Sequence, residues 1–474
     1  MYYEGSESDR WHPAARRAPS SGDLGAAEPS PQGGQRLSIA ALVLAISLLT
    51  FLAGAFIVLL KLPPYALLNA AYRAGEALYV QRTAYADPVE TDLWFDARTP
   101  RRGVTINKAA KTYPGLTLFT SGHDTVASLI DMDGRIVHQW RKPFSEVWDE
   151  SSVVSHPRPD RFVYFDKAHV FPNGDVLVVY IGVGDTPWGL GLVKLDKDSN
   201  VIWKFLERVH HDVEVGADGR IYTLTHRLRN ERLEEHRFVE PPFIEDFLVI
   251  LSPDGALEKK ISLTEALARS PYGRFTATVP HFALQDPLHT NAVEPIEGEA
   301  AKNFPFAGEG NVLLSFRESG LIATFDPRNE VFTWGTRGPW IGQHDPDLLP
   351  NGNLLLFDNN GDVGHNGLSR VLEVDPKSME IVWSYGGTSA EPLESVLRSE
   401  QQRLPNGNTL ITESDGGRLL EVTPAGEIVW QYRNPVRADL KGTERIAIVS
   451  GGRRLAPAEL DPEFLSEVGD SARR

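Results

Sequence analysis

One pattern returns along most of this chain: a polar turn followed by a short apolar strand that ends in tryptophan. The last two intervals between these tryptophans are 49 and 47 residues, and the 131-residue interval before them has room for two units. A degenerate copy without tryptophan, SPDGALEKKI at 252–261, lies inside that longer interval. The degenerate copy and five tryptophan copies define six units, and the tryptophans are Trp140, Trp203, Trp334, Trp383 and Trp430.

A second pattern alternates with the first, a turn of the Pro-Asn-Gly type that opens an apolar strand, as in FPNGDVLVV at 171–179 and LPNGNLLLF at 349–357. Asn-Gly pairs tolerate positive φ and are typical of hairpins. A period of about 50 residues with four strands per unit is typical of a propeller, and no unit has the helical period of a solenoid. We therefore expect an all-β fold, a six-bladed β-propeller.

A single apolar run at 37–60 precedes the repeats and lies between Arg36 and Lys61. Its 24 residues without a charge are enough for a helix that crosses a membrane core of about 30 Å. The run is longer than the apolar region of a signal peptide. We expect an uncleaved signal-anchor that places the protein in the cell membrane as a single-pass protein, with the propeller on the extracytoplasmic side.

Composition divides the rest of the chain and excludes several classes of function. A net charge of −16 without a basic stripe argues against nucleic-acid partners. The absence of cysteine excludes disulfides, thiolate catalysis and cysteine-ligated metals. The expected segments are a disordered tail at 1–36, the anchor at 37–60, a juxtamembrane segment at 61–112, the catalytic propeller at 113–440, and a C-terminal strand and tail at 441–474.

Several polar residues fall at one register of the predicted blades. The first strand of each propeller blade lines the central channel, so residues at one register converge on its axis. Counting back eight positions from the hairpin glycines reaches Asp166, His211, His344 and Ser399. In the unit between the two histidines an acidic insertion lengthens the strand connection, and removing it brings His289 near the same position. A residue needed only for blade structure would recur in every unit, so we interpret the three histidines as a functional site.

A cation accompanies these imidazoles. Arg317 ends the strand that follows His289, where other units end in Phe357-Asp358 or Thr412-Glu413. A guanidinium matches two oxygens of a sulfate or phosphate. An imidazole is a competent nucleophile and a second one can move a proton. This set of groups favours transfer of a tetrahedral oxyanion group. A further motif, DNNGD at 358–362, lacks the downstream glutamate of a calcium loop, so we expect a hairpin turn there.

These segments also resemble a known family. The order and spacing of five motifs are similar to those of the arylsulfotransferases, over residues 113 to 436. The motifs are HHDVEV at 210–215, HTN at 289–291, SFR at 315–317, GQHDPDLLPNGNLLLFDNNG at 342–361 and SEQQRLPNGNTLITE at 399–413.

The resemblance implies a ping-pong reaction in which His344 takes a sulfuryl group from an aryl sulfate, forming a sulfohistidine, and a phenolic acceptor then receives it. It implies no nucleotide sulfate donor (PAPS independence), no cofactor and no metal. His211, His289 and Arg317 would be the other catalytic residues, with the choice of general acid left open between the two histidines. Asn291 would belong to the substrate site, and we extend that expectation to three further residues, Asp166, Asp345 and Ser399.

Two alternatives remain open from the sequence. A metal-dependent propeller hydrolase or lactonase would need several carboxylates on the axis, and Asp166 is the only carboxylate at the register. A non-catalytic propeller that binds a ligand or partner is compatible with the fold, since one fold hosts many functions. The oligomeric state is not indicated by the sequence.

Overall fold

The computed structural model describes residues 31–65, 67–68, 87–184, 188–234 and 239–471. The chain divides into two compact units, Met1–Val80 and Gln81–Arg474. Most of the predicted disordered tail and the helical part of the predicted juxtamembrane segment lie outside the described residues.

The described part of the first unit is mainly one helix, α1 (Pro31–Leu59). It begins several residues before the predicted anchor. Its apolar part, Ser38–Leu59, has a mean hydropathy of 2.7, and none of it is buried within the protein. By length and composition this helix is able to cross a membrane, a test that a signal sequence also passes.

The second unit is a six-bladed propeller, as the repeats predict. Six sheets of four or five antiparallel strands form its blades, and a seventh sheet has three strands. Blade 1 contains β28 (Val449–Leu455), β3 (Leu116–Ser121), β4 (Val126–Ile130) and β5 (Ile136–Arg141). Blade 2 contains β6 (Val163–Val170), β7 (Val176–Gly182), β8 (Gly189–Leu195) and β9 (Val201–Phe205). Blade 3 contains β10 (Val209–Val215), β11 (Ile221–Arg229), β12 (Phe243–Leu251) and β13 (Leu257–Ser262).

The remaining blades follow in chain order. Blade 4 contains β14 (Thr290–Pro295), β15 (Val312–Phe316), β16 (Leu321–Asp326) and β17 (Val331–Arg337). Blade 5 contains β18 (His344–Leu348), β19 (Leu354–Asp362), β20 (Leu368–Val374) and β21 (Ile381–Tyr385). Blade 6 contains β22 (Glu400–Arg403), β23 (Thr409–Glu413), β24 (Arg418–Val422), β25 (Ile428–Arg433) and β2 (Gly103–Asn107).

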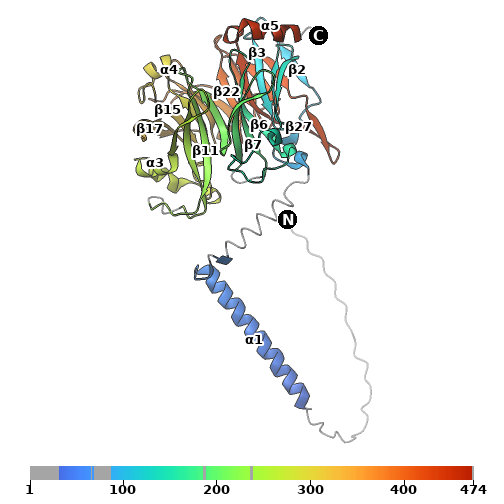
Figure 1. Cartoon of the computed structure of the whole chain (residues 1–474), viewed down its shortest axis with the longest axis vertical. Coiled ribbons are helices and arrows are strands. Elements are labelled where there is room, and N and C mark those ends of the chain that lie inside the picture. Colours follow the sequence, from blue (N-terminus) through green and yellow to red (C-terminus); the bar gives the residue numbers. More distant parts are fainter. Residues whose placement is uncertain (1–30, 66, 69–86, 185–187, 235–238, 472–474) are drawn as a thin grey trace, which may run out of the picture. The chain divides into compact units, whose positions relative to one another are not determined.

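Both ends of the propeller reach beyond the range 113–440 expected from the repeats. β2 pairs with β25 as an outer fifth strand of blade 6, and β28 pairs with β3 as the inner strand of blade 1. In Figure 1 the cyan β2 and β3 accordingly stand in the same part of the molecule as the orange and red C-terminal strands. The three-stranded sheet joins β1 (Trp94–Asp96), β27 (Thr443–Ala447) and β26 (Arg437–Leu440).

Three helices of the second unit cover the blades. α3 (Leu263–Arg269) follows β13, and α4 (Gly298–Asn303) forms within the acidic insertion between β14 and β15. α5 (Pro462–Ser471) contributes Phe464 and Val468 to a core shared by blades 1 and 2.

The repeated tryptophans connect neighbouring blades, which explains their spacing. The indole nitrogen of Trp140 in blade 1 donates to the carbonyl of Gly174 in blade 2, at 2.9 Å. Trp430 in blade 6 donates to Met132 of blade 1 at 3.0 Å. Trp203 packs its ring against Gly255 of blade 3, but its buried indole N–H has no hydrogen-bond partner among the described residues.

This difference gives a matched pair of variants. Trp140→Phe should lower the free energy of unfolding by about 1 kcal/mol or more, because it removes the hydrogen bond and leaves the carbonyl of Gly174 unpaired. Trp203→Phe should cost less, since the N–H that it removes is already unpaired. Denaturant unfolding of the full chain in detergent measures both. Equal losses would contradict the role given to the indole hydrogen bond.

Candidate active site at one end of the propeller channel

The inner strands of five of the six blades share a distortion at the height of the predicted register, and β22 of blade 6 pairs regularly. The pairing of the inner strand with its neighbour shifts at Phe165/Ala168, His210/Val213, Thr290/Ala292, His344/Asp347 and Val449/Gly451. Such bulges bend a strand and re-aim its side chains. Next to these shifts, His211, His289 and Asp345 have positive φ values of 59°, 47° and 50°. Backbone in this sparsely populated region often marks functional sites.

The register predicted from the sequence is present, with one change. On the inner strand of each blade, the residues that line the channel cavity begin at one position. These first lining residues are Lys167, Asp212, Ala292, Asp345, Glu400 and Gly451. The residues just before the first five of these are Asp166, His211, Asn291, His344 and Ser399. Blade 4 therefore places Asn291 at the register, and His289 comes two residues earlier.

His211, His289 and His344 nevertheless lie within electrostatic reach of one another. The ring centroids of His211 and His289 are 4.9 Å apart in an edge-to-face arrangement. Trp188 packs against His289 at 5.3 Å. Burial lowers the pKa of His211 well below its usual value, and His289 and His344 lower it further. All three rings are therefore held in the neutral form that a nucleophile or base requires.

His344 is held in one tautomer. Its Nδ1 lies 2.8 Å from Oδ1 of Asn359 and 3.0 Å from the carbonyl of Gly342. The amide of Asn359 is itself oriented, because its Nδ2 donates to the carbonyls of Ser395 and Arg398, both at 2.8 Å. Oδ1 must then accept, so His344 carries its proton on Nδ1 and Nε2 is unprotonated. Burial and then the Arg317 cation lower the pKa of His344 to about 3, so the ring stays neutral at physiological pH.

His289 forms a buried pair with a carboxylate that the sequence reading did not single out. Its Nδ1 makes a short hydrogen bond with Oδ2 of Asp286, and its Nε2 is buried without a partner among the described residues. Burial raises the pKa of Asp286 to about 7. The pair is therefore able to hold one extra proton near neutral pH, in a position where Nε2 can release or accept it.

Arg317 stands directly after β15 and belongs to this site. Its backbone N–H donates to the carbonyl of His289 at 3.2 Å. Its guanidinium lowers the pKa of both His289 and His344, after burial the largest influence on each. The neighbouring Glu318 accepts from Arg317 Nε at 2.9 Å, so a carboxylate holds the cation where an anionic substrate would bind.

Of the four residues expected to bind substrate, Asn291 and Ser399 form hydrogen bonds with the backbone, and the other two are carboxyl groups with a cation nearby. Asn291 is buried and donates from Nδ2 to the carbonyl of Gln343, at 2.8 Å, just before the nucleophile candidate. Ser399 Oγ accepts from the N–H of Ser414 at 3.0 Å. Asp345 instead forms an ion pair with Lys167 at 3.0 Å. Burial raises the pKa of Asp166 to about 6, against the opposing effect of Arg398.

Beyond the register, toward the Asn-Gly hairpins, the channel is acidic. A partly open cavity of about 510 Å³ lies there. Lys167 forms ion pairs with Asp212, Asp345 and Glu400 at 3.2, 3.0 and 2.9 Å. Three more carboxylates line the cavity, from Glu214, Glu294 and Asp347. The channel thus contains more carboxyl groups than the register alone predicted, and Arg403 and Arg453 line the same cavity. Burial raises the pKa of Glu294 and Asp347 well above the usual value, so these two groups are largely uncharged near neutral pH.

The sequence analysis did not predict several residues of the site. The motif DNNGD was expected to form a hairpin turn, but it belongs to strand β19, where Asn359 contacts His344. Asp286 lies three residues before His289, a spacing that offered a signal. Arg398 directly precedes the register residue Ser399, and its cation also lowers the pKa of His289. Trp188 lies in a stretch with no repeat pattern.

A comparison with protein families agrees with this site. The family model described as "Arylsulfotransferase (ASST)" matches residues 167–435, more than half of the chain. The chain belongs to the arylsulfotransferase family. Membership supports a sulfotransferase activity that acts on aryl substrates. It also agrees with the resemblance seen in the motifs, which lie in the matched range.

Other comparisons are more distant. No curated protein matches the sequence. A Bacteroides caccae protein of unknown function is 12% identical, with a TM-score of 0.45 over 72% of this chain and 98% of that chain. A streptogramin B lyase is 13% identical, with a TM-score of 0.38 over 76% of this chain and 95% of that chain. A virginiamycin B lyase from Staphylococcus aureus is 11% identical, with a TM-score of 0.32 over 57% and 69%.

Proposed function

We propose that this arylsulfotransferase moves a sulfuryl group from an aryl sulfate to a phenol by a ping-pong mechanism, through a sulfohistidine on His344. The observation that supports this most directly is the hydrogen bond from Nδ1 of His344 to Asn359. It leaves Nε2 with its lone pair, in a neutral ring close to the Arg317 cation. Such a nucleophile needs no nucleotide sulfate donor, because the aryl sulfate itself supplies the sulfuryl group.

In the first half of the cycle, His344 Nε2 attacks sulfur, and the bond from sulfur to the aryl oxygen breaks. Arg317 offers two N–H groups to the sulfuryl oxygens, in exchange for part of its contact with Glu318. The sulfonated ring keeps its Nδ1 proton, because the Asn359 amide is not a base. The ring is therefore cationic and becomes a good leaving group, which departs as neutral imidazole in the second half.

His289 is the better of the two candidates for proton transfer. With the extra proton on the Asp286–His289 pair, Nε2 protonates the departing phenolate oxygen. Asp286 is then left as a carboxylate that accepts from Nδ1, and Nε2 is free to take the proton of the acceptor phenol. The acceptor oxygen attacks sulfur, the N–S bond breaks, and the pair returns to its first state. His211, edge-to-face with His289, would bind a sulfuryl oxygen.

The proposal is tested with the full chain in detergent, mixed with a chromogenic aryl sulfate with and without a phenol. We expect acceptor-dependent release of the chromophore and a labile mass increase of one SO₃ group on His344. His344→Asn should abolish both. His365→Asn, which changes an exposed histidine, should leave both unchanged. Equal silence of the wild type and His344→Asn over many donors and acceptors would contradict the proposal and favour a binding propeller.

The role of the Asp286–His289 pair predicts a dependence on the leaving group. Asp286→Asn should slow sulfuryl transfer from phenyl sulfate by about 100-fold, since phenolate then leaves without a proton. Transfer from nitrophenyl sulfate, whose leaving group needs no proton, should change much less. In the wild type, transfer from phenyl sulfate should fall as the pH rises through about 7, because the pair loses its proton there. Rapid-mixing measurements of the first turnover give these rates. An equal loss with both donors would contradict proton donation by the pair.

We further propose that α1 is an uncleaved anchor and that the propeller lies on the extracytoplasmic side. The support is the length and apolar character of Ser38–Leu59. Protease added to cells whose outer envelope layers have been removed should then degrade the propeller, whether it is periplasmic or extracellular, while a cytoplasmic control protein survives. Protection of the propeller until the cells are broken would contradict this orientation, and a mature chain that begins after α1 would contradict the anchor.

A further inference from the structure

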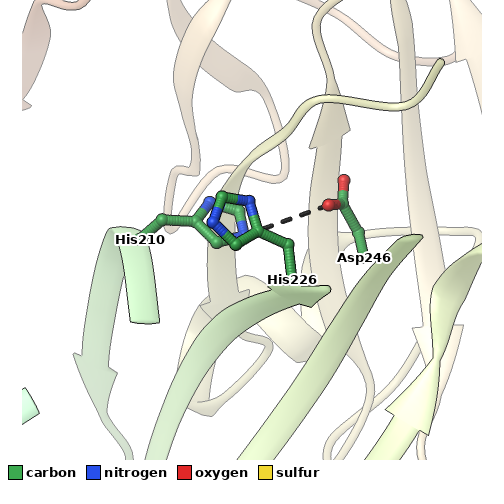
Figure 2. A group of neighbouring side chains, drawn as sticks. All are labelled: His210, His226 and Asp246. Carbon is green, nitrogen blue, oxygen red and sulfur yellow. Dashed lines mark ion pairs between the residues drawn. The ribbon is translucent and has the colours of Figure 1, made fainter. Parts of the chain in front are cut away.

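Behind His211, three side chains of blade 3 meet that the proposed sulfuryl transfer does not use. They are His210 on β10, His226 on β11 and Asp246 on β12, and Figure 2 shows the two rings overlapping with the carboxylate beside them. Their exposed fractions are 1%, 3% and 1%. His226 and Asp246 are directly paired across their strands, so their side chains stand on the same face of the sheet.

Each of the three has a buried polar atom without a hydrogen-bond partner among the described residues. These atoms are Nε2 of His210, Nδ1 of His226 and Oδ1 of Asp246. Nε2 of His210 is 4.0 Å from Oδ1 of Asp246, the pair marked by the dashed line in Figure 2. The ring centroids of the two histidines are 4.2 Å apart. Three unpaired polar atoms in one buried place are costly, unless something outside the chain satisfies them.

The unpaired atoms of the site have lone pairs that are able to bind a cation. Oδ2 of Asp246 accepts from the N–H and the hydroxyl of Thr290, at 2.8 and 2.7 Å. Oδ1 has no such donor among the described residues. A divalent cation would balance the carboxylate and would use the lone pairs of both imidazoles at once.

We propose that His210, His226 and Asp246 bind a divalent transition metal of the zinc type. Two imidazoles and one carboxylate are a common donor set for such ions. Potential ligand atoms of all three residues lie within 4.8 Å of one another. Ligands of a tetrahedral zinc ion are about 3.4 Å apart, so metal binding draws the three side chains together by up to about 1.4 Å. Thr290 remains as the partner that orients the carboxylate.

One contact must change when the metal binds. The N–H of Gly189, at the start of β8, points at Nε2 of His226 from 3.4 Å, the long limit of a hydrogen bond. A ring that binds metal through Nδ1 carries its proton on Nε2. This contact therefore opens, and the small movement takes place at a strand end.

The metal would also fix the tautomer of a site residue, an inference that rests on the proposed function. Nδ1 of His210 and Nδ1 of His211 are 2.7 Å apart, so one of them donates to the other. With metal on Nε2, His210 holds its proton on Nδ1 and must be the donor. His211 then carries its proton on Nε2, where it is able to donate to an oxygen of the sulfuryl group.

Metal analysis of the full chain in detergent tests the proposal. Protein produced in zinc-containing medium and purified without chelators should contain about one ion per chain, as a closed site does. Protein produced in cobalt-containing medium should show the visible absorption of cobalt bound to nitrogen and oxygen ligands. Asp246→Asn should lose most of the metal. His365→Asn should keep it, and it controls for an exposed histidine paired with a carboxylate, Asp362.

Different results would contradict the metal site and the proposed function. Wild-type preparations that are folded and contain less than roughly a tenth of an ion per chain in both media would overturn the metal site, even if Asp246→Asn fails to fold. Metal that is retained in Asp246→Asn but lost in His365→Asn would overturn it as well. Metal content does not depend on sulfuryl transfer, so an ion in a protein without sulfohistidine would contradict the proposed function and leave the metal site in place.

Discussion

The structure depends on the closure of a ring. The first blade is completed only when β28, from the C-terminal end of the chain, pairs with β3. Arg454 on β28 is fully buried and joins the two sides of this closure. It donates to Thr117 Oγ1 of blade 1 at 2.8 Å, forms an ion pair with Glu421 of blade 6 at 3.2 Å, and lies over the ring of Trp430. Removing one partner of a buried ion pair leaves an uncompensated buried charge, so Arg454 and Glu421 favour the arrangement in which β28 lies beside blade 6.

The chemistry depends on that closure, because no blade contains the site alone. Blade 3 supplies His211, blade 4 supplies His289 and Arg317, and blade 5 supplies His344. His211, His289 and His344 each stand at or next to a bulge of an inner strand, which re-aims the side chain. Arg317 directly follows β15. Ring closure therefore fixes the imidazoles relative to one another, and the channel has a cationic end beside them and an acidic end around Lys167.

Local sequence patterns predicted the positions that recur in each blade. They could not predict the contacts that form only when strands and blades pair. The hairpin spacing located His211 and His344, because the same strand geometry recurs in each blade. In blade 4 the acidic insertion interrupts the count, so the spacing placed His289 only near the register, and the exact register position is that of Asn291, two residues later. Asn359 was read as part of a turn because DNNGD has turn composition, whereas its contact with His344 depends on β18 pairing with β19. The extension of the propeller to β2 and β28 comes from pairings across more than 300 residues, which composition does not reveal.

The Nδ1 atom of each of the three imidazoles contacts a different kind of side chain. Each kind of partner is suited to a different proposed role. His344 is held by an amide, which orients the ring without stabilising a charge on it, as a nucleophile with a free Nε2 requires. His289 is held by Asp286, whose pKa burial raises to about 7, so the pair is able to carry one extra proton that Nε2 can pass on. His211 is held by another imidazole, His210, whose own second nitrogen faces Asp246. A different Nδ1 partner would change the proton position and the proposed role of each ring, even with the ring in the same place. The roles proposed for the three imidazoles therefore depend on the residues that contact them, and the sequence motifs contain only some of these residues.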